Sequence, residues 1–248
     1  MKVIYILWLR QIKRFFRARS RIVGAVGQPL LFLLALGYGL GSVYKQAGQG
    51  NYIEFLVPGI MAQTVLFSAM FYGAMIMFDR QFGFLRETLV APVSRIKIML
   101  GGALGGATTA VMQGSLVFVI SLALGFRPEH WDLLILAFLI LCMLGIGIAS
   151  FSSGIGSFVE DMQSFQAINQ FLVFPLYFLS GALYPLANVP TWLRIIADIN
   201  PMSYAVDAIR DALIGETHFG LAKDFIVLSL TAVILIAFGA YRFEHIEA

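Results

Sequence analysis

Residues 133–159, LLILAFLILCMLGIGIASFSSGIGSFV, form a run of 27 residues without a charged side chain. A helix needs about 20 consecutive apolar residues to cross the hydrocarbon core of a bilayer. For any single run of this kind, a fully buried helix of a soluble protein is the alternative. The number of similar runs elsewhere in the chain decides between the two.

Five other uncharged runs occur, at 22–44, 55–78, 98–126, 162–193 and 225–241. Of the 248 residues, 59% are hydrophobic and 12% are charged, whereas soluble domains carry about 25% charged residues. Six such runs favour membrane spans over buried soluble helices. We therefore predict an all-α integral membrane protein that forms a single transmembrane domain over residues 1–248. The six expected transmembrane helices are 22–44, 53–78, 97–125, 132–157, 165–184 and 222–242.

Positive charge is distributed unevenly among the loops that join these runs. With the N-terminus in the cytoplasm, twelve of the 17 Lys and Arg residues fall in inner segments. Cytoplasmic loops of membrane proteins carry an excess of Lys and Arg. The distribution predicts a multi-pass protein of the plasma (inner) membrane with both termini cytoplasmic. Because the basic residues sort by membrane side, they do not indicate a nucleic-acid partner.

The N-terminal segment 1–21 has the pattern of a basic amphipathic helix. Trp8, Phe15 and Phe16 share one helical face, and the cations share the other. Helices of this kind lie in the membrane interface, with aromatic rings at the acyl boundary and cations at anionic headgroups. The alternative is a topology signal alone. The residues expected to contact membrane lipids are Trp8, Arg10, Lys13, Arg14, Phe15, Phe16 and Arg17.

One strongly charged passage, FDRQFGFLRETLVAPVSR at 78–95, lies between two apolar runs. Phe78, Phe82, Leu85 and Leu89 follow helical spacing, and Pro92 disfavours helix at the residue before it. We predict a short amphipathic helix over 79–94, packed by this stripe against the membrane domain, with its polar side turned to a partner. An ordinary solvated loop is the alternative. The residues expected to act here are Arg80, Phe82, Leu85, Arg86, Glu87, Thr88 and Pro92.

A second unusual stretch covers 185–215, before the last run. Asn200 suits a helix N-cap, Pro201 suits the first helical position, and Gly215 suits a helix stop. The preceding segment around Trp192 is apolar enough to enter a leaflet. The pattern predicts a re-entrant or interfacial helical hairpin on the extracytoplasmic side.

The spans themselves carry little chemistry. No Asp, Glu, Lys, Arg or His lies in the middle of any run, which disfavours ion-coupled pumps and proton relays. The three histidines lie outside the runs, so membrane proteases that need an intramembrane histidine are excluded. The phosphate-loop pattern G-x-x-x-x-G-K-[ST] is absent. We expect no catalytic residue, metal or cofactor in this chain.

The motifs together resemble those of the ABC type-2 exporter permeases, the membrane subunits of drug, glycolipid and polysaccharide exporters. The likeness covers nearly the whole chain. It includes the amphipathic N-terminus, YIEFLVPGI (52–60), RQFGFLRETLVAPVSR (80–95) and NPMSYAVDAIRDALIG (200–215). In that family the first inner loop is the coupling helix that docks on the ATPase subunit. Glu87 falls at the family's acidic position, although Arg86-Glu87-Thr88 stands where Arg-Gly-Thr is usual.

The resemblance implies a transport pathway formed by two copies of the permease and driven by two ABC ATPase subunits. Those partners would bind ATP and Mg. It also implies a substrate path or dimer seam near the aromatic cluster beside Pro175. The residues expected there are Phe32, Gln63, Phe67, Phe171, Phe174, Tyr177 and Phe178. A stand-alone channel or pore-forming protein is the main alternative, and an intramembrane lipid-modifying enzyme is a weaker one.

Overall fold

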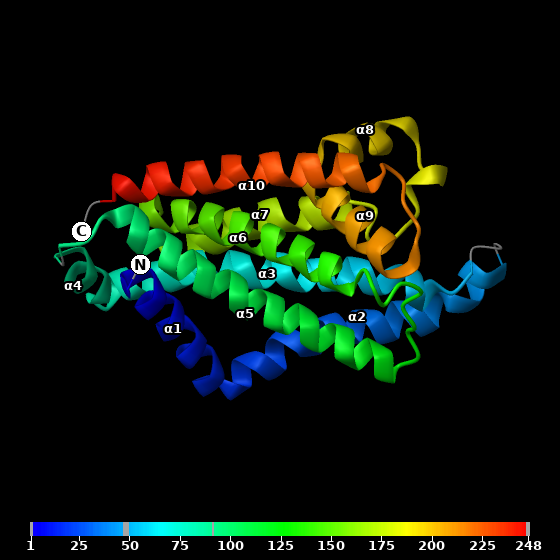
Figure 1. The fold of residues 1–248 in the computed structure, drawn as a ribbon, viewed down its shortest axis with the longest axis horizontal. Helices are drawn as coiled ribbons and strands as arrows, with labels where there is room; N and C mark the ends of the chain where they lie inside the picture. Colours follow the sequence, from blue (N-terminus) through cyan, green and yellow to red (C-terminus); the bar gives the residue numbers. More distant parts are fainter. Residues whose placement is uncertain (1, 47–49, 91, 247–248) are drawn as a thin grey trace.

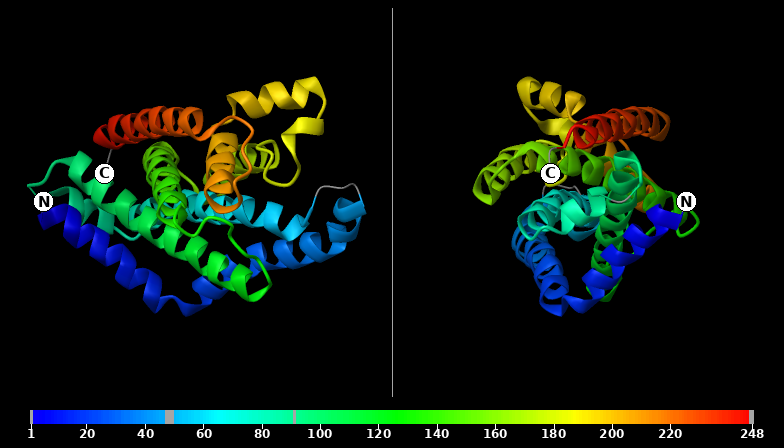
Figure 2. Two further views of the ribbon diagram at one scale, coloured as in Figure 1. Left: turned by 45° about the vertical axis from the view of Figure 1, so that its right-hand side comes forward. Right: turned by 90° about the vertical axis from the view of Figure 1, so that its left-hand side faces the viewer.

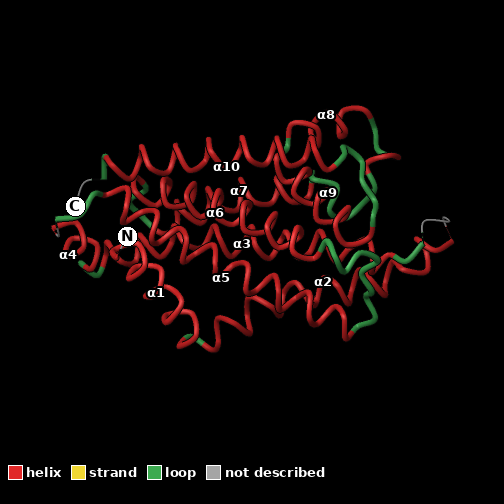
Figure 3. Tube along the Cα trace, viewed as in Figure 1, coloured by secondary structure: helices red, strands yellow, loops and turns green. Residues whose placement is uncertain are grey.

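The computed structural model describes residues 2–46, 50–90 and 92–246, apart from the side chains of 19–23, 25, 86 and 188. Within these ranges every regular element is helical (Figures 1 and 3). The elements are α1 (Lys2–Arg17), α2 (Arg19–Gln46), α3 (Tyr52–Gln81), α4 (Phe84–Val90), α5 (Arg95–Ala123), α6 (Leu134–Phe158), α7 (Met162–Phe178), η1 (Leu186–Asn188), α8 (Thr191–Ile199), α9 (Pro201–Ile214) and α10 (Leu221–Glu244).

Five of the described helices are long and apolar enough to cross a membrane: α2 from Val26 onward, α3, α5, α6 and α10. This confirms an all-helical, multi-pass membrane protein. The fifth expected span, 165–184, differs, because α7 has 17 residues and ends at Phe178 rather than at 184. Here the chain turns through Gly181 at φ +74°, and the Ser180 hydroxyl donates to the Tyr177 carbonyl oxygen at 2.7 Å. The uncharged run 162–193 therefore contains a turn, and hydropathy alone cannot detect it.

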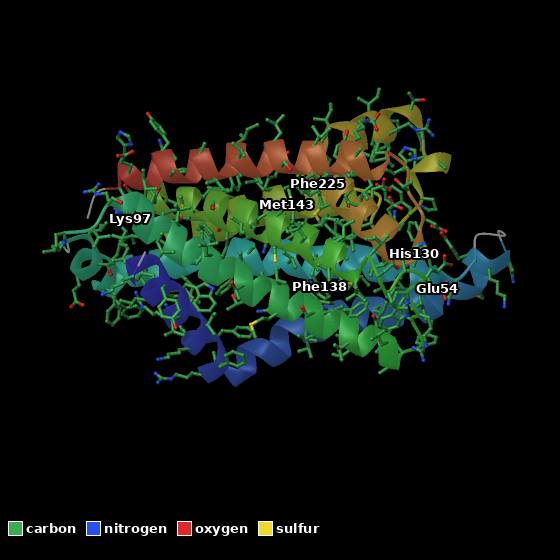
Figure 4. The ribbon with its side chains drawn as sticks, in the orientation of Figure 1. Glu54, Lys97, His130, Phe138, Met143 and Phe225 are labelled. Atoms are coloured by element: carbon green, nitrogen blue, oxygen red, sulfur yellow. The ribbon has the colours of Figure 1, made fainter. Side chains whose placement is uncertain are left out.

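The helices form an elongated bundle with α3 at its centre (Figures 1 and 2). Every residue of α3 from Phe55 to Leu66 is buried, since α2, α5, α6 and α9 surround it. Both chain termini and α4 lie at one end of the bundle, and α8, α9 and the C-terminal end of α2 lie at the other. In Figure 4 Lys97 marks the first end, Glu54 and His130 mark the second, and Phe138 and Met143 lie between them.

The caps of α9 were predicted correctly. The Asn200 side chain accepts a hydrogen bond from the Met202 amide at 2.9 Å, Pro201 occupies the first turn, and Gly215 ends the helix at φ +69°. A side-chain acceptor and a left-handed glycine satisfy the backbone groups that helix ends leave unpaired. Twelve of its fourteen residues are buried, so α9 is an internal helix at its end of the bundle.

Helix α1 packs more closely on the bundle than an isolated interfacial helix would. The Trp8 indole donates to the Thr108 hydroxyl of α5 at 3.0 Å, and Phe15 is buried. A Cβ at Gly101 or Gly105 of α5 would press on α1, so these small residues let the two backbones approach. Phe16 is exposed (54%), as expected of an aromatic residue at the acyl boundary, and so is Tyr5 on the same helix (58%). The protein interior surrounds Phe15 instead.

Candidate functional site

The expected single helix over 79–94 is broken in two by Gly83. Helix α3 runs on to Gln81, Gly83 adopts φ +79°, and α4 begins at Phe84. The prediction that the stripe from Phe78 to Leu89 packs against the membrane domain is wrong at Phe82, because the side chain of Phe82 is 71% exposed. A residue in the left-handed region changes the chain direction, so positions before and after it no longer share a helical face.

Leu85 is the residue that fixes α4 to the membrane domain. It is 5% exposed and belongs to the hydrophobic core, and Leu89 packs on that core one turn later. Phe82, Phe84 and Glu87 are exposed. Helix α4 therefore has one buried anchor, and its exposed Phe84 and Glu87, together with Phe82 at the end of α3, form an outward surface of two aromatic rings and a carboxylate.

The remaining residues expected in this loop occupy less prominent positions. The Thr88 hydroxyl donates to the Phe84 carbonyl oxygen within α4 at 2.9 Å. Arg80 is half-buried at the end of α3, and Pro92 is exposed. Arg86 lies within α4, and its side chain is outside the described set.

Asp79 joins α1 to α3 directly beside α4. Its carboxylate oxygens accept hydrogen bonds from the guanidinium groups of Arg10 and Arg14, each at 3.1 Å. The Asp79 side chain is 13% exposed, whereas those of Arg10 and Arg14 are 38% and 40% exposed. The sequence predicted lipid contacts for both arginines. The structure assigns each of them a protein partner as well.

A surface groove of about 960 Å³ runs between α1 and α4. Its wall from α1 carries Lys13 and Arg17, and its wall from α4 carries Phe84, Glu87 and Thr88, with Asp79 from α3. The groove is continuous with the outward surface of α4. A partner that contacts α4 at this end of the bundle therefore meets a mixed basic and aromatic surface.

We expect the substitution Asp79→Asn to loosen α1 from the bundle. The change keeps the side-chain shape and removes the charge that pairs with both arginines. Hydrogen bonds to charged groups contribute about 1.5–3 kcal/mol, and the partial exposure of the arginines reduces this toward about 1 kcal/mol. Thermal unfolding in nanodiscs measures the loss. Asp132→Asn, at an exposed loop residue, is the matched control, and equal melting of the two variants would contradict the expectation.

A second cavity, of about 420 Å³, lies midway along the bundle between α2, α3, α5 and α7. Six of the ten residues that line it have polar side chains: Gln28, Gln63, Thr64, Ser68, Gln113 and Asn169. Phe67, Phe71, Gly24 and Pro29 complete the wall. None of these ten residues is charged. Such a concentration of amides at the centre of an apolar bundle is costly unless the amides are paired.

The amide groups of this cavity are only partly paired. Gln113 accepts a short hydrogen bond from the Ser68 hydroxyl, which ties α5 to α3, and the Thr64 hydroxyl donates to the Ile60 carbonyl oxygen at 2.8 Å. By contrast, Gln63 Oε1 and Asn169 Oδ1 are buried without a hydrogen-bond partner among the described residues.

The structure brings together some of the residues expected on a substrate path and separates others. Gln63 and Phe67 line the cavity, the ring of Phe174 meets Phe67 edge-on at 5.7 Å, and Phe178 stacks on Phe174 at 5.9 Å. Phe171 is 80% exposed on α7, while Tyr177 is fully buried in the core. Phe32 packs against the core from α2.

Gln28, Ser68, Gln113 and Asn169 were not expected as site residues, because intramembrane amides are commonly helix-packing contacts.

At the opposite end from α4, Asp207 and Arg210 of α9 hold the hairpin in place. The Asp207 carboxylate accepts from the Thr217 hydroxyl and from the amides of His218 and Phe219, at 2.8–3.0 Å. The Arg210 guanidinium lies 3.9 Å above the Phe55 ring and donates to the Gly181 carbonyl oxygen at 3.1 Å. Burial lowers the pKa of Arg210 to about 10, so this cation remains charged at neutral pH and joins α9 to α3.

Comparison with known proteins supports the architecture found here. The model of the family described as "ABC-2 type transporter" matches residues 2–214. The ycf38 protein of Cyanophora paradoxa, described as a transport permease, is 30% identical over 94% of this chain and 84% of its own length. Nodulation protein J of Rhizobium leguminosarum bv. trifolii is 28% identical, over 90% of this chain and 86% of its own length. The daunorubicin resistance ABC transporter permease protein DrrB1 of Streptomyces coeruleorubidus is 25% identical, over 86% of this chain and 75% of its own length. This chain is a membrane permease that belongs to the ABC-2 type transporter family.

Proposed function

We propose that this chain is the permease subunit of an ATP-binding cassette exporter and that separate ATPase subunits drive it. The observation that carries the proposal is the construction of α4. Leu85 anchors this short helix in the core, while Phe82, Phe84 and Glu87 point outward. Exposed aromatic residues beside a charge are typical of protein interfaces. In this role α4 is the coupling helix.

The proposal assigns the end that carries α4 and both termini to the cytoplasm. The excess of Lys and Arg in the corresponding segments supports this orientation. In that arrangement α7 is the fifth of six spans along the chain, and its 17 residues meet the lower limit for crossing a bilayer. Helices α8 and α9 then form the extracytoplasmic hairpin, and the protein resides in the plasma membrane.

A second copy of the permease is proposed to complete the pathway. Two neighbouring apolar surfaces favour this dimer: Leu31 and Tyr38 are exposed on α2, and Phe171 and Phe174 are exposed on α7. The amide-lined cavity lies between the same two helices. A dimer formed across this face places one such cavity from each copy near the shared seam.

ATP hydrolysis is assigned to the partner subunits, with ATP and Mg bound there. The permease sequence contains no phosphate-loop pattern. The permease contributes the contact that receives force, formed by α4 and the adjoining α1 groove. Asp79 secures this groove through its two arginine partners. Force applied at α4 therefore acts on α1 and α3 together.

The substitution Glu87→Arg tests the function most directly. We expect the variant to fold and insert normally and to bind its ATPase at least tenfold more weakly, because a reversed charge at an interface costs about 2 kcal/mol or more. Affinity is measured by pull-down of the ATPase encoded with this permease. Glu129→Arg, at an exposed residue whose backbone amide donates to the Leu213 carbonyl oxygen of α9, at the opposite end of the bundle, is the control. A Glu87→Arg variant with unchanged ATPase binding would show that α4 is an ordinary loop helix and would favour a stand-alone channel.

A further inference from the structure

Arg95 joins the ends of two helices next to α4. It is the first residue of α5, and its guanidinium Nη1 donates to the carbonyl oxygens of Glu244 and Ile246, at 2.8 and 2.7 Å. Glu244 is the last residue of α10, and Ile246 follows it by two positions. Carbonyl groups at the C-terminal end of a helix lack partners within the helix and carry a partial negative charge. A cation that reaches them from another helix therefore holds the two helices together.

The end of α10 that Arg95 holds lies beside the anchor of α4. Phe243 and Ile246 are each 2% exposed and belong to the hydrophobic core. Phe243 and Leu85 line one small cavity, of about 30 Å³, together with residues of α1, α3 and α5. The cytoplasmic end of α10 is therefore one of the elements that surround the α4 anchor.

From this junction α10 runs along the bundle to the hairpin formed by α8 and α9 (Figure 1). In its first turn the Lys223 ammonium lies 5.0 Å from the centre of the Phe219 ring and 5.6 Å from that of Tyr204 in α9. Asp207 of α9 accepts hydrogen bonds from the amides of His218 and Phe219, just before α10 begins. Helix α10 is therefore attached to α9 at one end and to Arg95 at the other.

We propose that Arg95 is a positioning residue that ties α10 to the α4 end of the bundle, so that a displacement of α4 by the ATPase reaches α10 and the hairpin. The inference rests on the proposed function, which assigns the ATPase contact to α4. Only residues 91–94 separate the end of α4 at Val90 from Arg95. A movement of α4 therefore pulls on the first turn of α5 and, through the Arg95 guanidinium, on the carbonyl groups that end α10. Rigid helices joined by such contacts can carry coupling between distant sites.

The substitution Arg95→Leu tests this role with labels at two places. In a Cys142→Ala background, an environment-sensitive fluorophore is attached either at Ala222→Cys, an exposed position in the first turn of α10, or at Phe171→Cys on α7. The full permease and its ATPase are placed in nanodiscs, and the emission change caused by ATP with vanadate is recorded.

We expect Arg95→Leu to reduce the emission change at Ala222 about threefold or more, within the range that a linking residue contributes to coupling. The change at Phe171 is expected to stay as in the wild type, because α7 packs mainly on α3, which α4 reaches through Leu85. The affinity for the ATPase is also expected to be unchanged.

Two further variants separate positioning from a general loss of stability. Arg127→Leu is the matched control, because the Arg127 guanidinium also donates to two carbonyl oxygens, at 2.7 and 2.8 Å, but both belong to its own segment, at Leu122 and Phe126. This control is expected to respond as the wild type does at both labels. Arg95→Lys is expected to restore most of the change at Ala222, since an ammonium can still donate to the same carbonyl oxygens.

The inference would be overturned by an unchanged signal at Ala222 in Arg95→Leu, or by an equal loss at both labels, which would show that Arg95 supports the whole bundle. A loss of ATPase affinity in Arg95→Leu would also overturn it, because Arg95 would then belong to the docking surface. A wild type that responds at Phe171 but not at Ala222 would refute this inference alone. Failure of the proposed function is distinguishable, because the wild type would then show no ATP-dependent change at either label.

Discussion

The substitution Gly73→Val is expected to prevent assembly of a stable bundle. Gly73 lies where α3 crosses α6, and a Cβ at this position would fall within 3.0 Å of the Ser152 backbone oxygen and of the Phe165 ring. The Gly73 amide also donates to the Ser152 hydroxyl at 2.9 Å. A backbone oxygen cannot rotate away as a side chain can, so the two helices must separate.

This separation affects the centre of the molecule, because α3 is the most buried of the five candidate membrane spans in the described residues. A Cβ at Gly156 of α6 would in turn press on the Gly73 carbonyl at 2.6 Å, so the two glycines lie in one contact. Overpacking of a core costs about 1–3 kcal/mol and occasionally more. The loss of close helix packing adds to this. A total of about 3 kcal/mol or more lowers the folded-to-unfolded ratio roughly 100-fold.

The yield of monodisperse protein in mild detergent, together with its thermal unfolding, measures the effect. Gly39→Val is the matched control, because Gly39 is exposed on α2 and has open space around its Cβ position. The control is expected to purify and melt as the wild type does. A Gly73→Val protein that is as abundant and as stable as Gly39→Val would refute the close crossing of α3 and α6.

The sequence was sufficient to predict the membrane class and several local features. Uncharged runs are set by the solvent, since a helix in lipid can expose few charges, and five long helices occupy them. The caps of α9 were predictable because Asn200, Pro201 and Gly215 act within a few residues of themselves. Each of these features depends on local chemistry.

Features that depend on distant partners were not predictable in the same way. Gly73 has no glycine four residues away, and its role arises only from Ser152, 79 positions later. The pairing of Asp79 joins residues 65 and 69 positions apart. Likewise, the sequence could not distinguish Gln113, which pairs with Ser68, from Gln63, whose side-chain oxygen is buried without a partner among the described residues. Gln63 and Gln113 are both intramembrane amides, and only the tertiary structure separates their roles.

The break at Gly83 had the largest consequence for function, because it exchanged the roles of two residues. Helical spacing through 78–89 placed Phe82 on the stripe that packs against the spans. The left-handed conformation of Gly83 turns Phe82 outward and leaves Leu85 as the anchor. The two alanine variants, Phe82→Ala and Leu85→Ala, are therefore expected to show defects in different assays.

We expect Leu85→Ala to uncouple the transporter while the ATPase remains bound. Truncation of a buried leucine costs about 2–5 kcal/mol, and here the loss falls on the side chain that anchors α4 in the core. Phe82→Ala, at a side chain that is 71% exposed, is expected to leave the permease intact and to weaken ATPase docking roughly tenfold, as the loss of an interface aromatic does. Pull-down affinity separates the two variants.

Coupling can be measured without a known substrate. Phe171→Cys in a Cys142→Ala background places a label on the exposed face of α7, and ATP with vanadate is expected to change its labelling rate when the ATPase is coupled. Leu85→Ala should abolish that change at saturating ATPase, whereas Phe82→Ala should retain it once the weaker affinity is overcome. The opposite pattern, with Phe82→Ala bound but unresponsive, would mean that Phe82 packs against the spans as its spacing first indicated. Force would then enter the bundle ahead of Gly83, directly through the end of α3, and α4 would serve only as a docking surface.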